Sequence, residues 1–168
     1  PMNAILGFNH LALDTDLTPR QLDYQQKIDN AANSLLRLID DILDFSKIEA
    51  GKLDMEHRDF YLIQIFEKLS SMMSVQIAEK GLTFSVAVSE RIPSLLVGDS
   101  LRLEQVLTNL TSNAIKFTHT GGISIAVELD NESRQDVMLR FIIRDTGIGM
   151  NQEQVDQLFN PFHQADSS

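Results

Sequence analysis

The periodic segment at residues 19–50 constrains the fold most. Its apolar side chains recur with spacings of four, three, four and three, at Ile28, Ala32, Leu35, Ile39 and Ile42. This spacing places them on one stripe of a helix, as in helical bundles. Thr18 is a favoured N-cap residue, and Pro19 suits the first helical position. The segment therefore predicts a long amphipathic helix whose apolar stripe needs a packing partner.

A second helix is predicted just before it, over residues 1–13, with Ile5, Phe8 and Ala12 on one face. The polar residues 14–18 form a turn, so the two helices are expected to pair as an antiparallel hairpin. No capping residue precedes the first helix, and we expect it to begin upstream of the first residue. Two helices alone bury little apolar surface, which predicts a homodimer with a four-helix bundle.

The remainder of the chain mixes helical and strand periods, which predicts an α+β fold. Gly51 signals the end of the long helix, and residues 52–57 are the expected boundary between domains at 1–53 and 54–168. The expected elements are helices at 61–79 and about 100–117, strands at 82–88, 123–129 and 137–144, and a short helix at 151–158. In the helix at 61–79, the side chains expected to point inward are those of Ile65, Leu69, Met72 and Met73.

Composition excludes several classes of function. The chain has 24 acidic and 14 basic residues, a net charge of -10, which argues against binding to nucleic acid or anionic lipid. It has no cysteine, which excludes disulfides, thiolate zinc sites and a cysteine nucleophile and fits the cytoplasm. No apolar run reaches the roughly 20 residues of a membrane span, so no direct membrane contact is expected. A longer parent anchored in the inner membrane remains compatible with this.

The helix at 101–117 has two distinct faces. Its apolar side is expected to hold Leu103, Val106, Leu107, Leu110, Ala114 and Phe117. Opposite lie Asn109, Asn113 and Lys116, spaced i, i+4 and i+7. An amide oxygen can ligate Mg²⁺ and a lysine can meet a phosphate, so this face suits a metal-bound polyphosphate. An ordinary solvated polar face is the alternative.

The loop at residues 145–150 (DTGIGM) follows a predicted strand and precedes a predicted helix. Its two glycines permit backbone conformations and close ligand approach that other residues do not. Asp145 stands where it can accept a hydrogen bond from an exocyclic amine. Adenine presents an amino donor where guanine presents an acceptor, so this carboxylate would select adenine. An ordinary turn is again the alternative.

These segments resemble the conserved boxes of sensor histidine kinases of two-component systems. Residues 109–118 (NLTSNAIKFT) resemble the N box, 145–150 the first glycine box, 159–162 (FNPF) the phenylalanine box, 1–5 (PMNAI) the tail of the histidine box, and 44–53 (DFSKIEAGKL) the close of the dimerisation hairpin. The five matches occur in family order and cover nearly the whole chain.

The resemblance implies an ATP-binding α/β sandwich of the type shared with gyrase and Hsp90, a mixed sheet with helices on one face. It assigns the Mg²⁺ ligand to Asn113, phosphate contacts to Asn109 and Lys116, adenine recognition to Asp145, the hinges of a lid to Gly147 and Gly149, and the phenylalanine box of that lid to Phe159 and Phe162. The family reaction moves the γ-phosphoryl group of ATP to a histidine on the hairpin, then to an aspartate of a response regulator.

The family's phosphoacceptor histidine is expected to precede Pro1, and its second glycine box to follow Ser168. His10 is interpreted as an exposed bundle residue rather than a substitute acceptor. We therefore expect these 168 residues not to autophosphorylate in the family's way.

Two other readings stay open. One is a related ATPase that hydrolyses ATP, but Asn109 stands where those enzymes have a glutamate, and an amide cannot act as a general base. The other is a nucleotide-free dimeric scaffold or degenerate kinase. The signal, the cognate response regulator, any hybrid architecture, and phosphorylation within or across the dimer are not readable from the sequence.

Overall fold

The computed structural model describes residues 1–52, 54–134 and 136–157, without the side chains of residues 37, 40 and 41. The chain divides into two compact units, Pro1–Asp54 and Met55–Ser168. No helix in the described ranges combines the length and apolar character that a membrane crossing requires.

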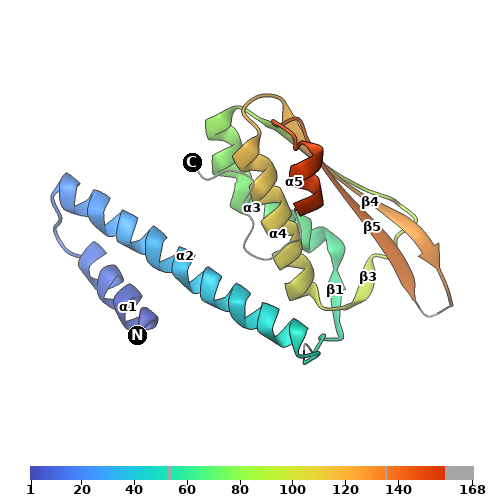
Figure 1. The fold of residues 1–168 in the computed structure, drawn as a ribbon, viewed down its shortest axis with the longest axis horizontal. Helices are drawn as coiled ribbons and strands as arrows, with labels where there is room; N and C mark the ends of the chain where they lie inside the picture. Colours follow the sequence, from blue (N-terminus) through green and yellow to red (C-terminus); the bar gives the residue numbers. More distant parts are fainter. Residues whose placement is uncertain (53, 135, 158–168) are drawn as a thin grey trace. The chain divides into compact units, whose positions relative to one another are not determined.

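The first unit is a helical hairpin of α1 (Met2–Leu13) and α2 (Pro19–Glu49), which lie side by side (Figure 1). Thr18 forms a capping box at the start of α2. The N–H of Gln21 donates to Thr18 Oγ1 at 3.3 Å, and the N–H of Thr18 donates to Gln21 Oε1 at 2.9 Å. The predicted start of the long helix is thereby confirmed.

A polar contact anchors α1 on α2. Asn9 is 4% exposed, and its Nδ2 donates to the carbonyl oxygen of Gln25 at 3.2 Å and to Asp29 Oδ1 at 3.3 Å. His10 Nε2 lies 3.1 Å from the same carboxylate oxygen, with 65% of its side chain exposed. The predicted exposure of His10 is confirmed.

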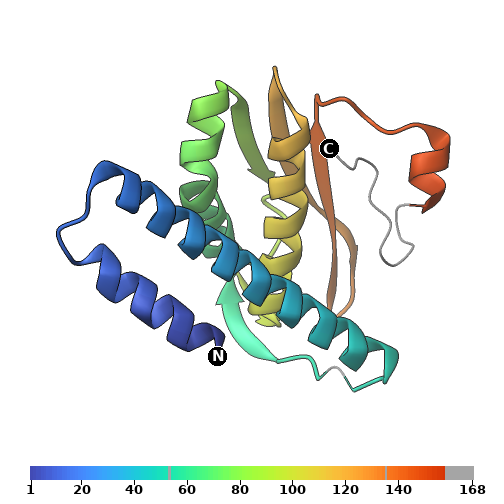
Figure 2. The same cartoon turned by 60° about the vertical axis from the view of Figure 1, so that its left-hand side comes forward.

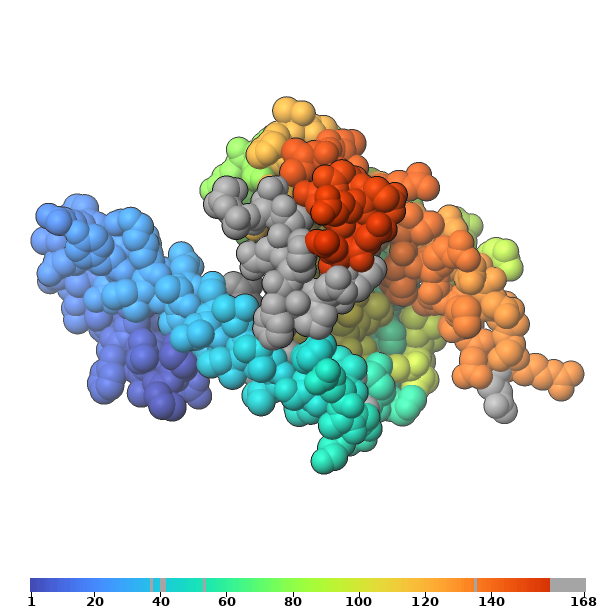
Figure 3. All heavy atoms as spheres, in the orientation of Figure 1, coloured from blue at the N-terminus to red at the C-terminus, as the bar shows by residue number. Residues whose placement is uncertain are grey.

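Much of the apolar surface of the hairpin is not covered by the hairpin itself. With 12 residues, α1 lies along only part of α2, which has 31 (Figures 1 and 3). Among hairpin residues of described burial, only Asn9 and Ala32 are buried. The exposed large apolar side chains include Phe8, Leu11, Leu38, Ile42 and Ile48. The hairpin thus lacks a core of its own.

The second unit has eight described elements: β1 (Arg58–Tyr61), α3 (Leu62–Lys80), β2 (Thr83–Val88), β3 (Leu95–Gly98), α4 (Ser100–Phe117), β4 (Gly122–Glu132), β5 (Val137–Asp145) and α5 (Gln152–Gln157). Strands β2, β4 and β5 form a sheet in that order, with β2 parallel and β5 antiparallel to β4. Strands β1 and β3 form a separate antiparallel pair.

Helices α3 and α4 cover one face of the three-stranded sheet (Figure 2). Alternate residues of β4 point into the core, where Ile123, Ile125 and Val127 are at most 2% exposed. They pack with a cluster that includes Leu69 of α3 and Leu107 of α4. The predicted α+β class, with a mixed sheet and helices on one face, is confirmed.

On α3 and α4, some of the residues that pack into the core differ from those predicted. Met72, predicted to point inward, is 51% exposed, and Val106 and Leu110 are 54% and 45% exposed. Those three predictions are wrong. The buried positions of α4 instead include Thr111 and Ile115, because this helix packs against both α3 and the sheet.

Asp99 starts α4 and also holds the segment that enters this unit. Its Oδ1 accepts the N–H of Arg102 at 2.9 Å, and its Oδ2 accepts the N–H of Glu56 at 3.1 Å. These two backbone hydrogen bonds hold the pKa of the Asp99 carboxyl below its ordinary value, and the bond from Arg102 has the larger effect. The ionised carboxylate therefore ties two chain segments together.

Replacing Asp99 by Asn should leave the helix cap but remove the charge. A carboxyl whose pKa is lower in the folded state stabilises the fold above its unfolded pKa, and this stability is lost as pH falls through the folded value. The difference in unfolding free energy between wild type and D99N should therefore shrink as pH falls from about 6 to about 3. Urea unfolding across that range measures it, and parallel curves would contradict the role.

Candidate functional site

The polar face of α4 carries three of the predicted site residues. Asn109, Asn113 and Lys116 are all exposed. Nδ2 of Asn113 lies 3.5 Å from Oδ1 of Asn109, a long hydrogen bond along the helix. Nζ of Lys116 lies 4.9 Å from the centroid of the Phe117 ring. The face thus offers two amide groups and one cation to solvent.

Asp145 is the last residue of β5, opposite Ile123 near the start of β4. Its carboxylate is exposed, and its Oδ1 accepts the N–H of Gly147 at 2.9 Å. No described contact engages its other oxygen, Oδ2. The loop therefore fixes the carboxylate through one oxygen and leaves the second available to a ligand.

The glycine-bearing loop is joined to the end of α4. The N–H of Ile148 donates to the carbonyl oxygen of Phe117 at 3.3 Å. A Cβ atom on Gly147 would lie 2.5 Å from that same oxygen, so only glycine permits this approach. Gly149 has φ +67° and open space around it. The two glycines thus serve different needs, close packing at position 147 and backbone conformation at 149.

Thr146 locks the same loop to the turn after α4. Its Oγ1 donates to the carbonyl oxygen of Thr120 at 2.9 Å and accepts the N–H of Gly122 at 3.0 Å. Gly121, at φ +96°, leaves no room for a Cβ beside that hydroxyl. The sequence did not predict this role of Thr146, whose only local signal is the pair Gly121 and Gly122 that it contacts.

The structure thus brings Asp145 and Gly147 to the end of α4 that carries Lys116 and Phe117. In Figures 1 and 2 this end of the helix and the end of β5 lie together. Asn113 lies on the same helix, about one turn before Phe117. Phe159 and Phe162 fall outside the described residues. The helix predicted at 151–158 is α5, whose start Asn151 caps by accepting the N–H of Gln154 at 2.8 Å.

A metal at this site would need ligands from outside the protein. The described residues contain no group of three or more histidines, cysteines or carboxylates able to hold a cation. Asn113 is the best placed donor, since no described contact engages its Oδ1. Mg²⁺ typically takes one or two protein ligands together with substrate phosphates and water. This donor set therefore fits a metal that arrives with a polyphosphate.

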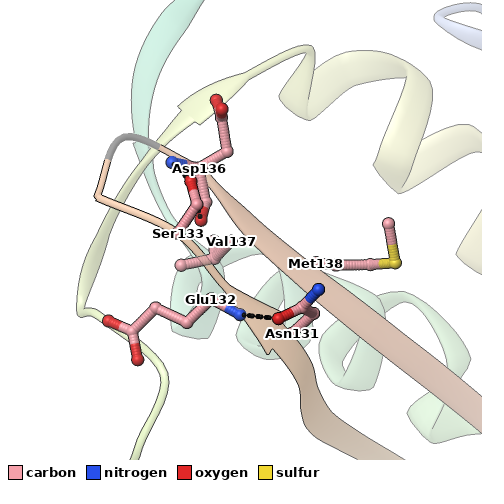
Figure 4. Close-up of a pocket in the computed structure, with 6 residues that line it drawn as sticks. All are labelled: Asn131, Glu132, Ser133, Asp136, Val137 and Met138. Atoms are coloured by element: carbon pink, nitrogen blue, oxygen red, sulfur yellow. Dashed lines mark hydrogen bonds between the residues drawn. The ribbon is translucent and has the colours of Figure 1, made fainter.

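Two surface hollows lie elsewhere. One is at the tip of the β4–β5 hairpin, the opposite end from Asp145, and is lined by Asn131, Glu132, Ser133, Asp136, Val137 and Met138 (Figure 4). The other lies between α3 and the edge strand β2, lined by Ile63, Phe66, Glu67, Ser70, Val86 and Val88. Neither includes a predicted site residue.

Comparison with known proteins matches both units. Residues 1–51 match the family described as His Kinase A (phospho-acceptor) domain, and residues 98–168 match the Histidine kinase-, DNA gyrase B-, and HSP90-like ATPase family. Sensor histidine kinase GacS of Pseudomonas protegens is 48% identical over 168 residues, and the histidine-protein kinase BarA of Escherichia coli K12 is 43% identical. Both alignments cover 100% of this chain and 18% of the relative.

A solved structure shares the architecture. Full-length ShkA in complex with AMPPNP superposes with a TM-score of 0.73 at 30% identity, covering 92% of this chain and 32% of that one. The fold and site therefore define an ATPase-type domain that follows a helical phospho-acceptor domain. Both units thus match domains of histidine kinases, and the chain spans less than a fifth of the length of the two curated relatives.

Replacing Gly147 by Ala should loosen the loop from α4, because the new methyl group meets the Phe117 carbonyl. We expect a loss of about 1–3 kcal/mol in unfolding free energy, typical of overpacking. Gly98→Ala is the matched control in the same unit, since its Cβ would make only an ordinary contact of 3.5 Å with Phe60. Chemical denaturation measures both, and equal effects of the two variants would contradict the packing role.

Proposed function

We propose that this chain forms the kinase core of a two-component sensor. Its second unit binds ATP for transfer of the γ-phosphoryl group to a histidine of the helical domain, from which a response-regulator aspartate receives it. The observation that carries the proposal is the junction of Phe117 with Gly147 and Ile148, which joins the polar face of α4 to the glycine-bearing loop. The two family matches support the same reading.

Asp145 would recognise the base. Its Oδ1 is held by the Gly147 N–H, and its Oδ2 is free to accept the adenine amino group. Gly147 and Gly149 would form the hinges of a lid that includes Phe159 and Phe162, the role that the family assigns to them. The nucleotide would then extend from Asp145 along α4.

The polar face of α4 would bind the phosphates. Lys116 must turn from the Phe117 ring to meet them as a point charge. Asn113 would hold Mg²⁺ through Oδ1, with Asn109 beside it. Mg²⁺ bound there supplies charge neutralisation at the phosphate oxygens. These residues position the nucleotide, which is the main contribution of the protein to phosphoryl transfer.

The chemistry of Asn109 favours transfer over hydrolysis. Its amide cannot take a proton from water, so it cannot serve as a general base. A related ATPase needs such a base near the γ-phosphate. The phosphoryl group would therefore go to a positioned histidine side chain in preference to water.

The hairpin would supply the dimer and the surface for the response regulator. Its exposed apolar residues, such as Phe8 and Ile42, need a covering partner. A second copy packed about a twofold axis would cover them in a four-helix bundle.

The nucleotide site is tested by thermal unfolding with Mg²⁺ and ADP. At about 100 times its dissociation constant, ligand adds about 2.7 kcal/mol to the stability of the unit that binds it. Asp145→Asn should abolish this gain, because its Oδ1 can still hold the loop while its amino group opposes that of adenine. GDP should give no gain in either protein.

Asp59→Asn is the control for that substitution, since Asp59 is an exposed carboxylate on β1. It should respond to ADP as wild type does. No gain in the wild type would contradict nucleotide binding and favour the scaffold reading. A gain that survives in D145N would remove Asp145 from the site.

The dimer is tested by light scattering at about 50 μM chain, a concentration at which dimers with dissociation constants near 1 μM are populated. We expect twice the chain mass of 18.9 kDa. Ile42→Glu should raise the dissociation constant at least about tenfold, because the dimer would bury an unpaired charge. Gln26→Glu, an exposed polar position on the same helix, is the charge-matched control. Monomer mass for the wild type would refute the bundle.

A further inference from the structure

The last residue of α3, Lys80, makes a dense contact with the end of α4. Its Nζ donates to the carbonyl oxygens of Ile115 at 2.6 Å, Lys116 at 3.0 Å and Thr118 at 3.3 Å. An ammonium group has three donors, so all of them are used here. The three acceptors belong to the last turn of α4 and its C-cap.

This contact supplies hydrogen-bond donors to the carbonyl end of a helix. The last carbonyls of a helix have no partner within the helix, and they carry the negative end of its dipole. A cation seated on them stabilises the final turn. In this chain the final turn is also the part of α4 that bears Lys116 and meets the glycine-bearing loop at Phe117.

We infer that Lys80 is a positioning residue for the phosphate-binding end of α4. This rests on the proposed function. Lys80 holds the backbone of Lys116 from the α3 side, while the Ile148 N–H holds the next carbonyl, that of Phe117. Lys80 does not touch the nucleotide; it keeps the turn that presents Lys116 from fraying. Its effect should therefore fall on the phosphates more than on the base.

The chain offers a matched contrast on the same two helices. Lys68 of α3 pairs with Glu104 of α4, with Nζ 2.6 Å from Oε1. That pair joins α3 to the first turns of α4, whereas Lys80 joins it to the last turn. A lysine whose role is only to hold α3 against α4 should behave alike at both places.

The experiment compares Lys80→Met with Lys68→Met in the full chain. Calorimetry measures the affinity for Mg·ADP and for adenosine, and urea unfolding measures the stability of each variant. We expect K80M to weaken Mg·ADP binding about tenfold, the effect of a lost helix-end cation on the geometry of the turn. Adenosine affinity should change less than about twofold, and K68M should leave both within about twofold.

A second arm separates positioning from long-range attraction. Removing a positive charge near the phosphates also lowers the local potential, but salt screens that effect. The ratio of wild-type to K80M affinity for Mg·ADP should persist at about 1 M salt if Lys80 acts through the turn. If K80M does not fold, Lys80→Gln, which keeps two donors without the charge, takes its place with the same expected split.

Several outcomes would overturn the inference. Wild-type Mg·ADP affinity in K80M would do so, as would equal losses for Mg·ADP and adenosine, equal effects of K80M and K68M, or an effect that vanishes at high salt. Failure of the wild type itself to bind Mg·ADP would instead count against the proposed function. The two failures are therefore distinguishable.

Discussion

The satisfied carbonyl end of α4 is the constraint on which the candidate site depends. The carbonyls of Ile115 and Lys116 accept Lys80 from α3, and that of Phe117 accepts Ile148 from the glycine-bearing loop. Helix ends without such partners fray, because their polar groups then turn to water. Here the partners come from two distant parts of the sequence. The helix end therefore fixes where both of these parts lie.

This arrangement separates the rigid part of the site from the part offered to ligand. The N–H of Thr146 donates to the carbonyl oxygen of Gly122 in the turn after α4, and the N–H of Ile148 donates to that of Phe117 at the helix end. The side chains of Asp145, Asn113 and Lys116 nevertheless remain exposed. Groups held by their backbones and free at their tips can meet a ligand with little reorganisation, which favours binding and phosphoryl transfer.

Sequence predicted the features that depend on local signals. Thr18 caps α2 as predicted, and the strands predicted at 82–88, 123–129 and 137–144 are β2, β4 and β5. Strands β1 and β3 were missed because each has four residues, too few to show a period. Burial on α4 was partly wrong because tertiary packing, rather than hydropathy, selects Thr111 over Val106. The contacts of Lys80 could not be predicted from local sequence, because its acceptors lie at least 35 positions away.

The two units differ in what their folding requires. The second unit buries large side chains such as Leu69, Leu107 and Ile125 within one chain, so it has a core of its own. The hairpin buries Asn9 and Ala32 among its described residues and leaves its larger apolar side chains exposed. In the dimer proposed above, its order would come from association, whereas that of the second unit need not.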